Sequence, residues 1–226
     1  MICFGHRGAM GYKVENTLES FEHAIELGAD AIEFDLYEID NELFVFHDRH
    51  LERLCGIEAY ITNKSVDFIK SLKVHGKYKI PTLDEVIELI DNRVSINIEL
   101  KNETSDLFTN KLKELNDESI IVSSFNHHEL KKIKTKLPET KIGALHVALP
   151  INNSKFAKEL DSYSVHPSIS TVTKEFVQDA HNNGLKVFVY TVNKKQDILR
   201  MQEYGVDGLF TNYPDLMIEI LGLKKS

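Results

Sequence analysis

The stretch AIEFDLYEIDNELFVFHD, residues 31–48, decides the fold and carries several candidate reactive side chains. Its first half is an apolar run typical of a buried strand, interrupted only by acids. Glu33 and Asp35 are two residues apart, and because side chains alternate across a strand, both carboxylates project from one face. Two carboxylates about 4 Å apart repel by roughly 4 kcal/mol at an effective dielectric of about 20. A cation is therefore expected between them, and a divalent metal ion is the leading candidate.

The same stretch predicts a hairpin. Asn41-Glu42 is expected to form the turn, after which the strand LFVF leads to His47 and Asp48. The second strand thereby returns a histidine and a further acid toward the strand that carries the paired carboxylates. Acidic and imidazole groups are thus expected to converge within one hairpin.

Strands and helices alternate on both sides of this hairpin. The run ICFGH, residues 2–6, reads as a short buried strand, and Thr17 can cap the helix that follows it. Another helix opens at Thr82, after which the alternation becomes regular. Further strands are expected at 94–100, 119–124, 141–145, 162–166, 186–192 and 206–211, and helices at 105–115, 126–136, 154–160, 173–183, 194–204 and 214–221.

Eight strand-helix units in this order predict an α/β fold, a closed (β/α)8 TIM barrel. The alternative is an open doubly wound sheet, which is disfavoured because no glycine-rich dinucleotide turn follows the first strand. Residues 49–80 lose the regular pattern and are expected to form a small insertion after the second barrel strand. A single domain over 1–226 is expected, since α/β barrels of this length form one core.

Composition narrows the classes of function. The formal net charge is -8, and binding to a nucleic-acid backbone needs a basic face, so no nucleic-acid partner is expected. No run approaches the ~20 apolar residues of a membrane span, and the N-terminus has no basic leader or apolar signal segment. We therefore expect a cytoplasmic protein without a transmembrane segment. The sequence leaves the oligomeric state open.

Polar side chains recur at the predicted strand ends. Active sites of such barrels form at the carboxyl ends of the strands, so these side chains are expected at one mouth. In IELK, residues 98–101, Glu99 and Lys101 share a strand face and add a third carboxylate with a cation beside it. Interior salt bridges from the acids to Arg7 and Lys101 are the structural alternative to a metal site. The strand-end set comprises His6, Glu33, Asp35, Glu99, Lys101 and His166.

Seven short motifs give the chain a family resemblance. They are HRG at 6–8, ENT at 15–17, ExD at 33–35, HD at 47–48, IPTLDEV at 80–86, IELK at 98–101 and VYTVN at 189–193. In this order, and over nearly the whole chain, they resemble the glycerophosphodiester phosphodiesterase family. The resemblance implies a metal-dependent TIM-barrel enzyme that hydrolyses a small-molecule glycerophosphodiester to an alcohol and glycerol 3-phosphate.

The resemblance also implies the ligands of one divalent metal ion. Glu33, Asp35 and Glu99 are the implied ligands, and their all-oxygen donor set suits Mg²⁺ or Ca²⁺, with Mn²⁺ also possible. Arg7 and Lys101 are implied to hold the phosphate. These expectations agree with the charge argument from the paired acids.

His6 and His47 are the implied acid–base pair. Phosphodiester cleavage needs one group to deprotonate the attacking oxygen and one to protonate the leaving alkoxide, and two imidazoles titrating near neutral pH can supply both. Family members are thought to use the substrate's own glycerol hydroxyl as the first nucleophile, giving a cyclic phosphate that water then opens. The sequence does not say which histidine acts first as the base.

Three further side chains are candidates for substrate binding. Glu15 has a family position at the mouth, but next to Thr17 it can equally stabilise a helix N-terminus. Tyr190 stands where many family members carry Trp, which leaves the preference for a head group open. His166 either lines the mouth or only packs before Pro167. The remaining histidines considered read as helix-surface or loop residues: His127, His128, His146 and His181.

Other functions remain as alternatives. A lysophospholipase D or a phospholipase-C-like barrel would cleave lipid diesters, but such substrates favour an exposed apolar rim, and the charged insertion offers only short apolar pieces. A phosphate-ligand binding barrel without turnover is disfavoured because both histidines, all three acids and Lys101 are present. A metal-dependent sugar isomerase on the same fold would leave the HR and HD motifs unexplained.

Overall fold

Strands and helices alternate along the chain in the computed structural model, which describes residues 1–223. The barrel strands are β1 (Ile2–His6), β2 (Ala31–Ile39), β6 (Ser95–Leu100), β7 (Ile120–Ser124), β8 (Lys141–His146), β9 (Ser164–Pro167), β10 (Lys186–Val189) and β11 (Gly208–Thr211). The helices of the alternation are α1 (Leu18–Glu26), α4 (Leu83–Ile90), α5 (Asp106–Leu115), α6 (His127–Lys136), α7 (Lys155–Glu159), α8 (Lys174–Asn182), α9 (Lys195–Tyr204) and α10 (Pro214–Leu221).

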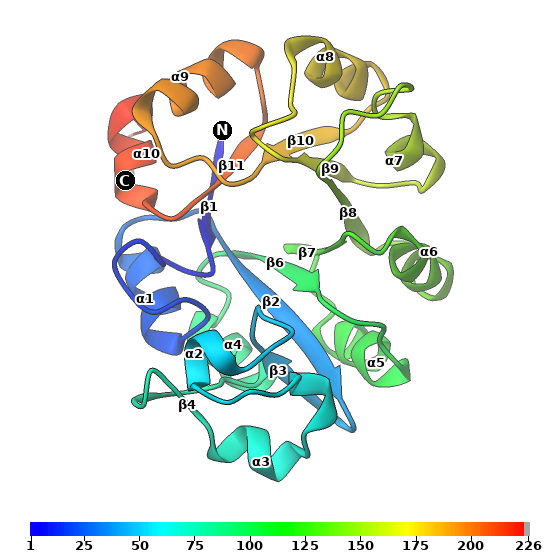
Figure 1. Cartoon of the computed structure of the whole chain (residues 1–226). Helices are drawn as coiled ribbons and strands as arrows, with labels where there is room; N and C mark the ends of the chain where they lie inside the picture. The colour runs from blue at the N-terminus through cyan, green and yellow to red at the C-terminus, as the bar shows by residue number, and fades with distance from the viewer. Residues whose placement is uncertain (224–226) are drawn as a thin grey trace.

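These strands form a closed ring, and the helices surround it (Figure 1). The hydrogen-bonded order is β1-β11-β10-β9-β8-β7-β6-β2, all pairs being parallel, and β1 pairs with β2 to complete the circle. The predicted (β/α)8 TIM barrel is confirmed. The alternative prediction of an open doubly wound sheet is wrong, because β1 pairs with both β2 and β11, whereas an open sheet would end in two edge strands.

Helix starts follow the local chemistry of the sequence. The Thr17 side chain accepts a hydrogen bond from the backbone of Ser20 and caps α1, as predicted. Thr82 and Glu85 form a reciprocal capping box at the start of α4. These caps accept hydrogen bonds from backbone amides that have no partner within the helix, and they fix the residue at which each helix begins.

The hairpin forms with a turn one residue earlier than predicted. Strand β3 (Glu42–Val45) runs antiparallel to β2, and Glu42 already pairs with Ile39. Asp40 and Asn41 therefore make the turn, and Asp40 has φ 53, a left-handed conformation that Asp tolerates better than most residues. As a result β2 extends beyond the barrel, so its acids lie inside the strand and not at its end.

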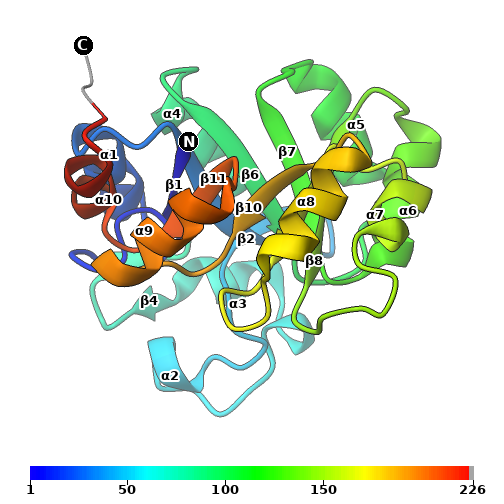
Figure 2. The same cartoon turned by 90° about the horizontal axis from the view of Figure 1, so that it is seen from above.

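Residues between β3 and α4 form five short elements on one end of the barrel. They are α2 (Glu52–Cys55), the 3-10 helix η1 (Ile61–Asn63), α3 (Val66–Ser71), β4 (Lys73–Val74) and β5 (Tyr78–Lys79). Figure 2 shows α2, α3 and β4 gathered at the end of the barrel opposite the N-terminus. Leu51, Leu54, Ile61 and others pack with Phe44 in an apolar cluster of their own, which holds this segment on the β2–β3 hairpin.

The barrel interior divides into an apolar part and a polar part. Phe4, Phe188 and Phe210 fill the apolar part. The ring centroid of Phe4 lies 4.9 Å from that of Phe188 and 4.6 Å from that of Phe210. This aromatic layer makes one part of the interior apolar, while buried polar side chains such as Asn97, Ser123 and Ser164 occupy another. Within residues 1–223, no helix combines the length and the apolar character needed to cross a membrane.

Candidate active site

The register of three adjacent strands brings the predicted acids and His6 together. In β1 and β2, His6 lies opposite Glu33, and in β2 and β6, Asp35 lies opposite Glu99. Residues paired across neighbouring strands lie within contact distance of each other. The four residues therefore share one small region, although His6 and Glu99 are 93 positions apart in the chain. The convergence expected from the motifs is therefore present in the geometry of the sheet.

Glu33, Asp35 and Glu99 form one acid cluster. One carboxylate oxygen from each lies within 4.8 Å of the other two. Glu33 and Asp35 are almost fully buried, and Glu99 is partly so. Three buried carboxylates at this separation require compensating positive charge.

Two cations from opposite sides provide part of that compensation. The Arg7 backbone donates to Glu33 Oε2 at 2.8 Å, and Arg7 Nε lies 3.2 Å from Asp35 Oδ2. Lys101 Nζ lies 2.6 Å from Glu99 Oε1 and 3.4 Å from Asp35 Oδ1. The interior salt bridges considered as an alternative are therefore present, alongside the acid cluster.

The turn that presents Arg7 depends on Gly8. Arg7 has φ 51 and Gly8 has φ 81, and a side chain at Gly8 would lie 2.5 Å from the backbone carbon of Ser20. Only glycine accepts both the left-handed conformation and this close approach of α1. The HRG motif is thus a tight turn that aims the Arg7 backbone amide at the acid cluster.

The acids differ in how readily they ionise. Burial, followed by the charges of Asp35 and Glu99, raises the pKa of Glu33 well above its usual value. Burial and the Asp35 charge likewise raise the pKa of Glu99 to about 7, against the opposing effect of Lys101. Burial would raise the pKa of Asp35 too, but the charges of Arg7 and Lys101 outweigh it and lower that pKa. Asp35 is therefore the acid that stays ionised.

The cluster fits a hard divalent cation. Among residues 1–223, Asp35 Oδ1 is a buried oxygen that accepts no hydrogen bond. Burial, together with the neighbouring acid charges, raises the pKa values of Glu33 and Glu99, so a bound cation would favour their ionised forms. Carboxylate oxygens are the ligands that Mg²⁺ and Ca²⁺ prefer, so the donor set suits such an ion, as does Asp35 Oδ1, which lies 3.4 Å from Lys101 Nζ but accepts no hydrogen bond from the residues described.

His6 is held by a residue near the other end of the chain. Its Nδ1 lies 2.8 Å from Oδ1 of Asn212, which directly follows β11. Because a carbonyl oxygen accepts, Nδ1 carries the proton and Nε2 keeps its lone pair. Burial first, and then the charge of Arg7, lower the pKa of His6 to about 4. The imidazole is therefore neutral near pH 7.

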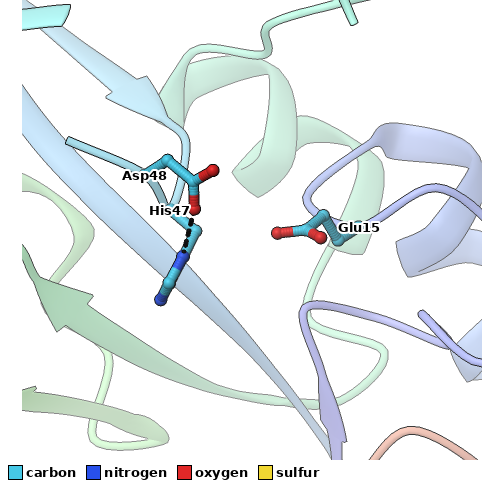
Figure 3. A group of neighbouring side chains, drawn as sticks. All are labelled: Glu15, His47 and Asp48. Atoms are coloured by element: carbon cyan, nitrogen blue, oxygen red, sulfur yellow. Dashed lines mark hydrogen bonds and ion pairs between the residues drawn. The ribbon is translucent and has the colours of Figure 1, made fainter. Parts of the chain in front are cut away.

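His47 is held by its neighbour Asp48. Nδ1 of His47 lies 2.7 Å from Asp48 Oδ1, and Figure 3 shows the ring directed at that carboxylate, with Glu15 facing both from another segment. Arg53 Nε and Nη2 donate to Asp48 at 2.6 and 2.9 Å. Burial would raise the pKa of Asp48, but hydrogen bonds from Arg53 and His47 lower it to about 2. Asp48 is thus an ionised acceptor that fixes the histidine ring.

Glu15, His47 and Asp48 form a second group with the spacing of metal ligands. Here, however, Arg53 already supplies the cation, because Nη1 and Nη2 also donate to Glu15 at 2.7 and 2.8 Å. Glu15 in addition accepts from Arg7 Nη1 at 2.8 Å. This group is therefore an ion-pair network and not a second metal centre.

A small cavity of about 30 Å³ separates the acid cluster from His166. His166 is fully buried, its Nε2 lies 2.8 Å from Ser164 Oγ, and its Nδ1 has no hydrogen-bond partner among the described residues. Tyr190 lines the same cavity, and its hydroxyl donates to the His146 carbonyl at 2.9 Å. His166 thus lies within the barrel, below Tyr190 and not on an exposed rim.

His146 does not lie where the sequence pattern indicated. It was expected on a surface or in a loop, but β8 continues one residue beyond the predicted end at 145. Its side chain is buried, with ring centroids 5.3 Å from Phe156 and 5.0 Å from Phe176. The prediction is wrong because α7, which carries Phe156, and α8, which carries Phe176, cover the end of β8.

Three supporting residues were not found from the sequence. Asn212 holds His6, Arg53 joins Glu15 to Asp48, and Asn16 donates to Asp35 Oδ2 at 2.8 Å. Only Asn16 carried a signal, because it lies inside the ENT motif. The other two act across long sequence separations or from the irregular insertion.

Comparison with known proteins decides the family. The model of the glycerophosphoryl diester phosphodiesterase family matches residues 6–216, nearly the whole chain. The chain belongs to this family. A glycerophosphodiester phosphodiesterase from Caldanaerobacter subterraneus subsp. tengcongensis is 35% identical over 236 residues, covering 97% of each chain. The resemblance inferred from the seven motifs is thereby confirmed.

Two further relatives carry different activity names. A phosphodiesterase from Oleispira antarctica, solved in complex with the product sn-glycerol-3-phosphate, has a TM-score of 0.88 and 26% identity, covering 98% of this chain and 97% of its own. A human lysophospholipase D is 24% identical over 266 residues, covering 96% of this chain and 84% of its own. As a family member, this chain is a phosphoric diester hydrolase.

Proposed function

We propose that the chain hydrolyses a glycerophosphodiester to an alcohol and glycerol 3-phosphate, with His6 and His47 as the acid–base pair. One observation carries this proposal: each imidazole is fixed through Nδ1 by a side-chain oxygen, and both interact electrostatically with the buried acid Asp35. A histidine oriented in this way can exchange a proton through Nε2. Two histidines with a purely structural role would not need to be oriented around the same acid.

In the first step the glycerol hydroxyl attacks phosphorus and loses its proton, and the bond from phosphorus to the leaving alkoxide breaks. Neutral His6 suits the base, because its lowered pKa leaves the lone pair available. His47 suits the acid that protonates the alkoxide, since Asp48 fixes its ring through Nδ1 and leaves Nε2 for the leaving group. In the second step water opens the cyclic phosphate, and the two histidines exchange roles.

Charge on the phosphoryl oxygens needs cations close by. Arg7 and Lys101 are proposed to contact the phosphate, since both already lie among the acids and carry a positive charge near neutral pH. Glu33, Asp35 and Glu99 would hold one divalent ion, Mg²⁺ or Ca²⁺ with Mn²⁺ as a further possibility, which supplies charge stabilisation of the phosphoryl oxygens. Glu15, His166 and Tyr190 are proposed to support substrate binding.

The test compares two substrates. Glycerophosphocholine and a choline phosphodiester that lacks the adjacent hydroxyl are incubated with the enzyme, and phosphorus-containing products are followed by NMR. We expect glycerol 3-phosphate from the first, little turnover of the second, and loss of activity with a chelator that Mg²⁺ or Ca²⁺ restores. Equal turnover of both substrates would contradict attack by the substrate hydroxyl.

A second candidate is the cleavage of a lipid diester such as a lysophospholipid. The insertion exposes Tyr60 and Phe68, and the loops after β7 and β8 add further exposed apolar side chains that would favour it. Phe125 contacts Tyr190 with ring centroids 6.0 Å apart, and Val147, Leu149 and Ile151 are exposed, Ile151 completely. Such a rim suits an acyl chain. Serine at Leu149 and Ile151 should lower turnover of a lysophospholipid and leave that of glycerophosphocholine unchanged.

Two broader expectations also remain proposals. We propose that 1–226 form one domain with an insertion at 49–80, supported by the packing of Leu51 and Leu54 onto the β2–β3 hairpin. A cytoplasmic location is proposed from the composition of the sequence. Fractionation of the expressing cells would test the second proposal directly.

A further inference from the structure

The insertion has no role in the reaction as described so far, yet one of its helices reaches the active site. Leu51, the residue just before α2, and Leu54 within it are buried in the apolar cluster that fixes the insertion on the barrel. Arg53 lies between them in sequence and is half exposed, on the side away from that cluster. A residue on a short helix anchored by two buried leucines has a fixed starting point for its side chain.

The Arg53 guanidinium bridges two carboxylates from different parts of the chain. Nε and Nη2 form a two-pronged contact with Asp48, while Nη1 and Nη2 contact Glu15. Four hydrogen bonds therefore use four of the five N–H groups that an arginine offers. The hydrogen bonds that Arg53 donates to Glu15 and then to Asp48 raise its pKa, so it stays charged. Little donor capacity is left for a substrate phosphate.

Asp48 is the element that transmits this contact to the reacting group. Its Oδ1 accepts both from Arg53 Nη2 and from His47 Nδ1, at 2.9 and 2.7 Å. The carboxylate cannot rotate without breaking one of these bonds, so the guanidinium fixes the acceptor that orients the imidazole. Without Arg53, Asp48 would have a single partner among the contacts described, and Glu15 would keep only Arg7.

We propose that Arg53 is a positioning residue for His47, and that the insertion serves the reaction by carrying it. Arg53 holds Asp48 and Glu15 in place, Asp48 directs the His47 ring, and His47 exchanges the proton. The inference rests on the proposed acid–base role of His47. It predicts a lower kcat with little change in KM, because Glu15 and Asp48 use the Arg53 donors and leave little capacity for binding a substrate.

The test uses Arg53→Ala and Arg53→Lys, with Arg93→Ala as a matched control. Arg93 also makes a two-pronged contact with the carboxylate of Glu22, at 2.8 and 2.6 Å. Arg93 precedes the start of β6, whereas the site residues Glu99 and Lys101 lie at the other end of that strand. We expect Arg53→Ala to lower kcat by about 10-fold to 10²-fold, the scale of a misplaced catalytic group, with KM within about twofold. Arg53→Lys should recover only part, because one ammonium cannot bridge two carboxylates in this geometry. Arg93→Ala should match the unaltered enzyme.

Chemical rescue separates positioning from a merely structural role. Because Arg53 is half exposed, guanidinium chloride far below denaturing concentrations should enter the gap and raise kcat of Arg53→Ala several-fold. It should not raise kcat of His47→Ala. Loss of kcat without rescue, together with a lowered Tm, would overturn the proposal in favour of a structural role. Unchanged kcat in Arg53→Ala would also overturn it, and if His47→Ala were inactive in the same assay, the proposed function would still stand.

Discussion

Asn212 Oδ1 lies 2.8 Å from Nδ1 of His6, across 206 positions of sequence. The contact joins the end of the first barrel strand to the residue after the last one. It sets the ring orientation of a proposed catalytic group without contacting the acid cluster. Its removal should therefore affect catalysis and leave metal binding largely intact.

The first prediction concerns this contact. Asn212→Ala should lower kcat by roughly 10-fold to 10²-fold, because the His6 ring loses the acceptor that selects its tautomer. Steady-state kinetics with glycerophosphocholine checks this. Asn182→Ala, which removes only an exposed contact with Gln178, is the control and should have normal kcat. Wild-type kcat in Asn212→Ala would show that His6 needs no such support.

Removal of either imidazole should nearly abolish activity. His6→Ala and His47→Ala are each expected to lose about 10²-fold to 10⁴-fold in kcat, the usual contribution of a general acid or base. Because the two act in one reaction, the double variant should lose far less than the product of the single losses. Circular dichroism should be unchanged in all three. A double loss equal to that product would indicate independent roles.

Metal affinity should rise with pH. Burial and the Asp35 charge raise the pKa of Glu99 to about 7, so below that pH a proton competes with the ion for the carboxylate. Ca²⁺ affinity, measured by isothermal titration calorimetry, should increase by up to about tenfold per pH unit for each acid that must lose its proton, and level off once Glu99 and Glu33, whose pKa is also raised, are both ionised. Glu99→Gln should bind more weakly and lose much of this slope. An affinity independent of pH between 6 and 8 would contradict the role of Glu99 as a ligand.

In the metal-free protein the contribution of Glu99 to stability should fall as pH rises. Between pH 4.5 and about 7 folded Glu99 keeps its proton, whereas the unfolded chain loses it. The folded state then binds more protons at this site, so its contribution to the free energy of unfolding falls through this window, while the lowered pKa values of His6 and His166 act in the opposite direction. Urea denaturation of the unaltered chain and of Glu99→Gln at several pH values, with chelator present, isolates the Glu99 slope as the difference between the two. Added Ca²⁺ should stabilise most at the upper end, where the acids are ionised.

The position of His166 can be tested through a glycine on the neighbouring strand. A side-chain carbon at Gly143 would lie 2.4 Å from His166 Cε1, so Gly143→Ala should overpack the barrel and cost about 1–3 kcal/mol in the free energy of unfolding. The double variant Gly143→Ala/His166→Ala should be less destabilised than the sum of the two single changes. Strict additivity would place the ring elsewhere.

Local chemistry accounts for what the sequence predicted correctly. Thr17 and Thr82 cap helices because their hydroxyls satisfy free backbone amides, a property that needs no distant partner. The spacing of Glu33 and Asp35 predicts one shared face because strand geometry alternates everywhere. Such signals are contained in a few neighbouring residues, so they can be read without knowing the fold.

What the sequence missed depends on contacts between distant segments. Asn212 reaches His6 only because β11 pairs with β1, and Arg53 reaches Glu15, 38 positions earlier, only because apolar packing holds the insertion on the β2–β3 hairpin. His146 looked like a loop residue because its burial comes from helices that follow it. The proposed roles of the site residues and the division into one domain stay predictions.

Closure of the ring between β1 and β11 has a consequence for biosynthesis. Asn212 follows His6 by 206 positions, so the ribosome releases His6 long before it releases Asn212. A growing polypeptide therefore holds the His6 imidazole without the partner that orients it until the segment with Asn212 has been made. Chains that stop early, before the final strand is made, would be expected to lack hydrolytic competence even where their earlier segments have folded.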